Sequence, residues 1–172
     1  MSLSDQAAPF LCDWDGDGDL DLLVGHGYDW PRIVINDGTN KRPAFREAQL
    51  ILSEGKPIRL LRDEILGPPD CWHNMGYLFP VFIDWDDDDL PDLMLPNETN
   101  RIFWYKNIGT RNKPVFSRRR RVIVEGFPDS AKIRTATAQL VAKSTGNVYP
   151  TDKSQPFHWR SDAAFVDSTA TV

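Results

Sequence analysis

The sequence lacks the features that define several classes of protein. It has only two cysteines, Cys12 and Cys71, among 172 residues, which is too few for a disulfide framework. Two alternatives remain open for them, a bridge between the two or a pair of buried thiols. The longest apolar run, residues 77–83, contains Pro80 and is far shorter than the roughly 20 apolar residues of a membrane-spanning helix. The sequence therefore predicts no membrane span.

An excess of positive charge is also absent. The chain carries 20 Lys and Arg residues against 25 Asp and Glu residues, for a net charge of −5. A general nucleic-acid binder needs a basic face, so we expect no nucleic-acid partner. The first residues, Met1 to Asp5, have neither the basic end nor the apolar core of a signal peptide, and none is expected in this sequence.

The chain contains an internal repeat with a spacing of 71 residues. Residues 9–57 align with residues 80–128 without a gap, and 15 of these 49 positions are identical. A third copy begins near the C-terminus, where Ala164 to Asp167 resembles the segment Phe82 to Asp84. Self-similarity at a fixed period is the signature of a repeat architecture.

Each repeat has the pattern of about four β-strands. Short apolar runs enter and leave an acidic loop, and a β-branched or aromatic run is followed by an Asn-x-Gly-Thr turn and a Pro-x-Phe strand. In these turns, Gly38 and Gly109 are predicted to supply a positive φ. Gly, Pro and Asn interrupt every longer stretch, which disfavours helices. Four strands match one blade of a β-propeller.

The predicted fold is therefore all-β, a partial β-propeller of two four-stranded blades plus the first strand of a third. Two blades cannot close a ring, so we expect a fragment of a longer protein or a ring of several copies. The expected divisions are a leader or added residues at 1–8, a first blade with its connection at 9–78, a second blade with a long connection at 79–156, and a truncated third blade at 157–172.

The two acidic loops have the spacing of an oxygen cage for a metal. They read Asp-x-Asp-x-Asp-Gly-x-x-Asp from residue 13 and Asp-x-Asp-x-Asp-Asp-x-x-Asp from residue 84. Position 6, Gly18 or Asp89, needs a left-handed conformation, and position 7 offers a backbone carbonyl. Such cages suit Ca²⁺, which takes six to eight oxygen ligands. The predicted ligands are Asp13, Asp15, Asp17, Asp19 and Asp21 in the first loop, and Asp84, Asp86, Asp88, Leu90 and Asp92 in the second.

An EF-hand is excluded, because position 12 is Val24 or Leu95 instead of Glu and the flanks are predicted strands. The stretch from Asp13 to Gly25, with its echo at 84–95 and the turns that follow, resembles FG-GAP/VCBS repeats. The resemblance implies propeller blades with Ca²⁺ loops between their first two strands, as in integrin α heads, bacterial surface proteins and some polysaccharide-lyase propellers. We expect the two Ca²⁺ ions to be structural. Trp14 and Trp85 repeat in phase inside the loops and are predicted to pack between blades.

The segments that join the blades hold a second set of candidates. Both contain a His next to a Trp shortly before the next predicted inner strand. Three interpretations stay open: sugar binding, proton abstraction in a lyase, or packing between blades. The candidate ligand residues are Trp72, His73, Tyr77, His158, Trp159 and Arg160.

The predicted function is a calcium-binding propeller segment that serves as a binding or scaffolding module, with polysaccharide or a cell-surface glycan as candidate ligand. The other expected partners are the remaining blades of the parent chain or further copies of this one. Extracellular Ca²⁺ would fill loops of modest affinity, so an extracellular or cell-surface location is expected. The alternative is a fragment of a polysaccharide-degrading enzyme, a lyase or a glycosidase, although we favour a non-catalytic role for this chain.

Overall fold

The structure, a computed structural model, describes residues 7–27, 30–60, 76–97 and 102–122. Within these ranges the chain forms antiparallel sheets and no helix, which confirms the all-β prediction. None of the described residues belongs to a helix that could cross a membrane. The third-blade strand predicted within 157–172 lies outside the described residues.

The first sheet is an antiparallel meander in which neighbours in sequence are neighbours in space. Its strands are β1 (Ala8–Cys12), β2 (Asp21–Gly25), β3 (Arg32–Val34) and β4 (Gln49–Leu50). The register pairs Cys12 with Asp21, so β1 and β2 are joined directly by the first acidic loop. The central strand β2 is almost wholly buried, as expected for its apolar residues.

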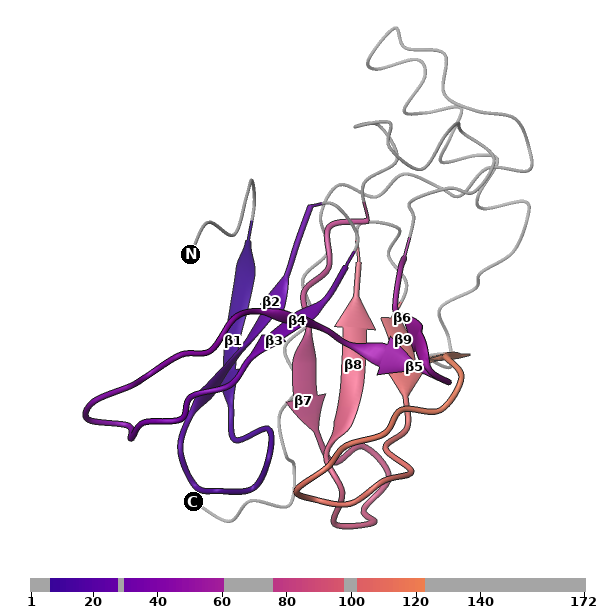
Figure 1. Cartoon of the computed structure of the whole chain (residues 1–172). Coiled ribbons are helices and arrows are strands. Elements are labelled where there is room, and N and C mark those ends of the chain that lie inside the picture. Colours follow the sequence, from indigo (N-terminus) through magenta and orange to yellow (C-terminus); the bar gives the residue numbers. More distant parts are fainter. Residues whose placement is uncertain (1–6, 28–29, 61–75, 98–101, 123–172) are drawn as a thin grey trace, which may run out of the picture.

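The second sheet repeats this meander. Its strands are β7 (Val81–Ile83), β8 (Asp92–Pro96), β9 (Ile102–Tyr105) and β10 (Arg120–Arg121). A small hairpin of β5 (Leu52–Ser53) and β6 (Lys56–Pro57) lies between the two units in sequence. Figure 1 shows the two large sheets side by side, with both acidic loops at the same, lower end.

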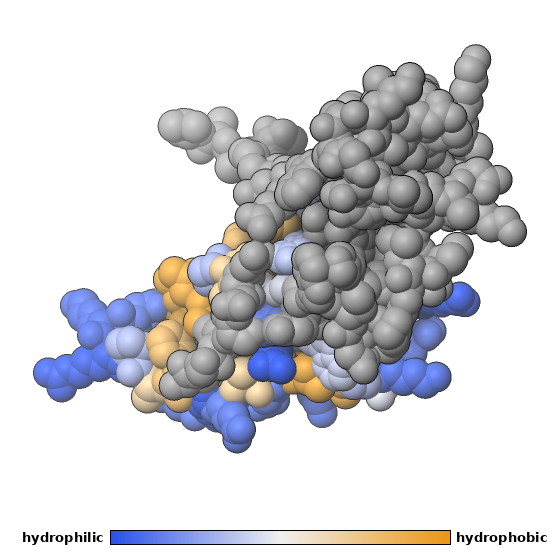
Figure 2. Space-filling model, turned by 90° about the horizontal axis from the view of Figure 1, so that it is seen from above, coloured by the Kyte–Doolittle hydropathy of each residue, from blue (hydrophilic) through white to orange (hydrophobic). Residues whose placement is uncertain are grey.

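The core lies between the two sheets and is aromatic at the end that carries the loops. The Trp14 ring stacks on Phe82 at a centroid distance of 4.6 Å and meets Phe116 at 5.6 Å. Trp14 belongs to the first acidic loop and the two phenylalanines belong to the second repeat, so Trp14 packs between the two repeats. Trp85 is 42% exposed, and because the residues predicted to form the next blade lie outside the described residues, its packing between blades stays a prediction. Seen from above, hydrophilic side chains occupy the outer margins of the described part, and hydrophobic ones lie nearer its middle (Figure 2).

The fourth strand of each sheet is shorter than predicted. The pattern predicts strands that begin with Pro-x-Phe at residues 43 and 114 and finish at residues 52 and 124. In the structure the strands begin later, at Gln49 and Arg120, and Phe45 makes an isolated bridge with Asn36, as Phe116 does with Asn107. The reason is that the Asn36 side-chain oxygen accepts the backbone N–H groups of Gly38 and Ala44. Side-chain bonds therefore close the turn where a strand ladder was expected.

The glycines of these turns are needed for a different reason than predicted. Positive φ values among the described glycines occur at Gly16, Gly18 and Gly55, and not at Gly38 or Gly109. A Cβ at Gly38 would instead lie 2.3 Å from the carbonyl oxygen of Arg42, and the second turn has the same close approach. The turn therefore excludes a side chain by contact with the backbone, and not by its φ angle.

Candidate metal centre

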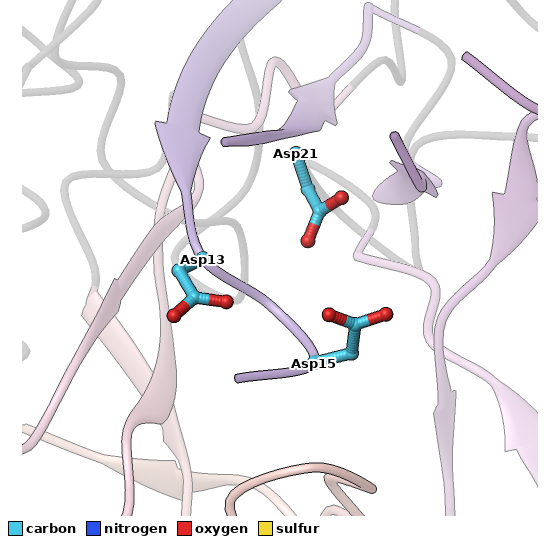
Figure 3. A group of neighbouring side chains, drawn as sticks. All are labelled: Asp13, Asp15 and Asp21. Atoms are coloured by element: carbon cyan, nitrogen blue, oxygen red, sulfur yellow. The ribbon is translucent and has the colours of Figure 1, made fainter. Parts of the chain in front are cut away.

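Three aspartates of the first loop come together at the end of the first sheet. Asp13 follows β1, Asp21 begins β2, and Asp15 lies between them on the turn that Gly16 and Gly18 make with φ values of 74° and 90°. One carboxylate oxygen from each aspartate lies within 4.8 Å of the other two. Their carboxylates face a common centre (Figure 3). The loop thus gathers oxygen ligands of the kind that Ca²⁺ prefers.

The electrostatics of this group favour a cation. The Asp15 oxygen Oδ1 is buried and has no hydrogen-bond partner. Burial raises the pKa of Asp15, and the neighbouring carboxylates of Asp17, Asp21 and Asp13 raise it further. A buried polar atom without a partner lowers stability. A cation held among these oxygens would give the Asp15 Oδ1 a partner and would reduce the repulsion among the carboxylates.

Asp21 is held in place by the backbone of its own repeat. It is 1% exposed, its Oδ2 accepts the Trp14 N–H at 2.8 Å, and its Oδ1 accepts the Asn36 N–H at 2.7 Å. Two fixed donors orient the carboxylate before any ion binds. This residue therefore connects the candidate metal centre to the start of β2 and to the Asn-x-Gly-Thr turn.

The other two predicted residues of the first loop have different contacts. Asp17 lies outside the group of three, and its Oδ1 accepts the Asp19 N–H at 2.8 Å. The Asp19 side chain in turn accepts the Asn40 N–H at 2.9 Å. The carbonyl ligand predicted at Asp19 stays a prediction.

A turn of the second sheet donates hydrogen bonds to the first loop, and neither of its donors is among the predicted site residues. Arg111 donates from Nη2 to both the carbonyl oxygen and the Oδ2 of Asp13, each at 2.9 Å. Asn112 donates from Nδ2 to the carbonyl oxygen of Asp15 at 2.7 Å. These polar residues follow the Asn-x-Gly-Thr turn of the second repeat, but the sequence offers no signal that they contact residues 97 and 98 positions earlier in the chain.

Substituting alanine for each loop glycine would measure how much the contact with Asn112 contributes to the free energy of unfolding. Both glycines have positive φ, but a Cβ at Gly16 would lie 2.8 Å from the Asn112 amide nitrogen, whereas one at Gly18 meets nothing within 4 Å. Gly18→Ala is expected to cost about 1 kcal/mol from its left-handed conformation. Gly16→Ala should cost about 1 kcal/mol more, because it also displaces the Asn112 hydrogen bond. Urea unfolding in metal-free buffer measures the difference, and equal losses would contradict the contact.

The second loop gathers a different set of acids. Asp84, Asp86 and Asp88 have oxygens within 4.8 Å of one another, and Asp92 is not among them. Asp92 is fully buried, its Oδ1 accepts the Asn107 N–H at 2.6 Å, and its Oδ2 accepts the Trp104 indole N–H at 2.7 Å. Burial raises the pKa of Asp92. The Leu90 N–H donates to Asp88 at 3.1 Å, and the carbonyl ligand predicted at Leu90 stays a prediction.

Lys106 supplies a cation to this second group. It follows β9, and its Nζ donates to Asp86 and also to the Asp88 Oδ2, the latter at 2.7 Å. The two carboxylates raise the pKa of Lys106, and the lysine lowers that of Asp88. Lys106 is not among the predicted site residues, although the repeat contains a signal: the equivalent position in the first repeat is Ile35.

The backbone of the second loop uses aspartates where the first uses glycines. Asp87 and Asp89 have φ values of 58° and 66°, at the positions that Gly16 and Gly18 occupy in the first loop. The left-handed conformation predicted at Gly18 and Asp89 is confirmed. Aspartate tolerates this region better than most residues, but glycine adopts it at less cost. The second loop is therefore the more strained of the two.

Most of the candidate ligand residues in the joints lie outside the described residues, namely Trp72, His73, His158, Trp159 and Arg160. Tyr77 is described, and it is partly buried with a φ of 44°. Cys71 also lies outside the described residues, whereas Cys12 is a buried free thiol whose pKa burial raises to about 12.

Comparison of the chain with models of protein families, with curated proteins and with solved structures finds no match.

Proposed function

We propose that this chain is a calcium-binding β-propeller segment of the FG-GAP/VCBS type that serves as a binding or scaffolding module. The observation that carries the proposal is the first acidic loop, in which three carboxylates converge and the buried Asp15 Oδ1 lacks a partner. A bound Ca²⁺ would join Asp13 at the end of β1 to Asp21 at the start of β2. The ion would thereby fix the hairpin on which the Trp14 contact between the sheets depends.

Ca²⁺ is preferred over other metals because of the ligand type. The three side chains that converge offer only carboxylate oxygens, and such hard ligands favour Ca²⁺ or Mg²⁺ over Zn²⁺. Backbone conformation in a glycine-containing loop adapts to the larger and less regular coordination shell of Ca²⁺, whereas Mg²⁺ demands near-ideal octahedral geometry. A millimolar extracellular Ca²⁺ concentration would fill such a loop, which supports an extracellular or cell-surface location.

The contacts between the sheets support the propeller architecture. Phe82 and Phe116, which receive Trp14, are 8% and 2% exposed. Their equivalents in the first repeat, Leu11 and Phe45, are 57% and 47% exposed. The first sheet thus presents the receiving face of this interface, and the second presents the exposed Trp85 that is equivalent to Trp14. Further blades, from the same chain or from another copy, would cover both faces in the manner of the observed contact.

The test of the calcium proposal is isothermal titration calorimetry of the full chain with CaCl₂. Asp15→Asn is expected to lower the Ca²⁺ affinity of the first loop at least about tenfold, because it removes one of the converging charges. Glu47→Gln is the matched control: it removes the same charge from an exposed position outside both loops and should leave the affinity unchanged. Equal affinities of Asp15→Asn and the wild type would contradict the proposal.

The same samples would also test the structural role of the ion. Saturating CaCl₂ is expected to raise the midpoint of thermal unfolding of the wild type and of Glu47→Gln, because a ligand that binds only the folded state stabilises it. The rise should be smaller in Asp15→Asn, and MgCl₂ at the same concentration should give a smaller rise in every sample.

A further inference from the structure

The two acidic loops, which the sequence makes equivalent, are neutralised in different ways. In the second loop, the Nζ of Lys106 contacts two of the three converging carboxylates, those of Asp86 and Asp88. The ammonium therefore lies where the ligands of a metal ion would meet. All three side chains are only partly exposed, at 24% for the lysine and 30% and 32% for the acids.

Among the described residues, no lysine or arginine takes the equivalent place in the first loop. The position equivalent to Lys106 is Ile35, which is 8% exposed and belongs to the hydrophobic core. The guanidinium that reaches this loop, from Arg111, pairs with Asp13 from the neighbouring sheet. It leaves the Asp15 Oδ1 without a partner. The first loop therefore keeps a buried carboxylate oxygen that is open to a further ligand.

An ammonium ion and Ca²⁺ compete for the same oxygens. A charge-assisted N–H···O bond places the nitrogen about 2.7–2.9 Å from a carboxylate oxygen, and Ca²⁺ binds the same atoms at about 2.3–2.6 Å. Two cations at these distances from one oxygen pair would repel each other strongly. Calcium entering the second loop must displace the lysine. Because Lys106 is part of the chain, its presence in the loop does not depend on the concentration of any ion in solution.

We propose that Lys106 is the resident cation of the second acidic loop and that only the first loop takes up Ca²⁺ at physiological concentration. This inference rests on the proposed calcium function of the first loop. The chain would then bind one Ca²⁺ where its sequence suggests two. The second hairpin would keep its shape when calcium falls, and the first would respond to it.

Calcium titration of four full-length variants tests the proposal. Lys106→Met removes the ammonium and keeps an unbranched side chain. Lys113→Met is the matched control, since it removes the same charge from an exposed residue of the following turn. Asp15→Asn weakens the first loop, and the double variant Asp15→Asn with Lys106→Met leaves the second loop to be observed alone. Circular dichroism checks that each variant is folded.

The wild type and Lys113→Met are expected to bind one Ca²⁺, and Lys106→Met two. The double variant should bind calcium at least about tenfold more tightly than Asp15→Asn alone, because two partly exposed ion pairs no longer compete with the ion. Two sites in the wild type, with an affinity at the second that Lys106→Met leaves unchanged, would overturn the role of Lys106 while the calcium function stands. An absence of calcium binding by every variant would overturn both.

Discussion

Replacing Trp14 by alanine is expected to lower the free energy of unfolding by about 3–5 kcal/mol. The indole is 8% exposed and stacks on Phe82 at 4.6 Å, with Phe116 at 5.6 Å. These rings come from different repeats, so the substitution removes the centre of the contact between the sheets. A cavity at that place cannot close without moving one sheet toward the other.

The chain contains its own control for this substitution. Trp85 occupies the equivalent position of the second loop but is 42% exposed, so Trp85→Ala should cost less than about 1 kcal/mol. Denaturant unfolding of both variants, followed by circular dichroism because the tryptophan signal itself changes, gives the comparison. Similar losses for the two variants would mean that Trp14 does not hold the sheets together.

Asp21→Ala is expected to cost about 3 kcal/mol even in metal-free buffer. The substitution leaves the buried N–H groups of Trp14 and Asn36 without acceptors, and each buried donor that loses its acceptor costs about 1–3 kcal/mol. The removal of one negative charge from a crowded group offsets part of this loss. Urea unfolding with a chelator present excludes any contribution from bound metal.

Asp17→Ala is the control for the buried hydrogen bonds that the Asp21 side chain accepts from the backbone. Asp17 belongs to the same loop and carries the same charge, but its bond to the Asp19 N–H is exposed. Its loss should change the free energy of unfolding by less than about 1 kcal/mol in metal-free buffer. If the two variants lost the same stability, the buried hydrogen bonds of Asp21 would not be what fixes the loop.

The repeat in the sequence predicts the strands well, because the period of apolar residues and the turn motifs are local. It cannot predict the surroundings of each copy. Trp14 and Trp85 occupy equivalent positions of the repeat, yet one is buried and the other is 42% exposed, because burial depends on which distant residues pack against each copy. The length of the fourth strands was predicted wrongly for a related reason. The Asn36 side-chain oxygen accepts backbone N–H groups that the strand pattern would pair with backbone carbonyls.

The position of the candidate metal centre could be predicted from the sequence, but not which aspartates of each loop converge. The acidic spacing indicates both loops, and the structure gathers Asp13, Asp15 and Asp21 in one and Asp84, Asp86 and Asp88 in the other. The difference arises from contacts far apart in the chain. Asn36 and Asn107 donate equivalent backbone bonds to Asp21 and Asp92, but the second oxygen of Asp92 accepts the Trp104 indole N–H, where that of Asp21 accepts the Trp14 backbone N–H. Lys106, 20 residues along the chain, donates to Asp86.

Diffraction from crystals grown with CaCl₂ tests the central claim most directly. We predict one strong peak between Asp13, Asp15 and Asp21, with oxygen ligands at about 2.3–2.6 Å and the Asp15 Oδ1 among them. A first loop that is ordered and contains no ion at saturating calcium would contradict the account.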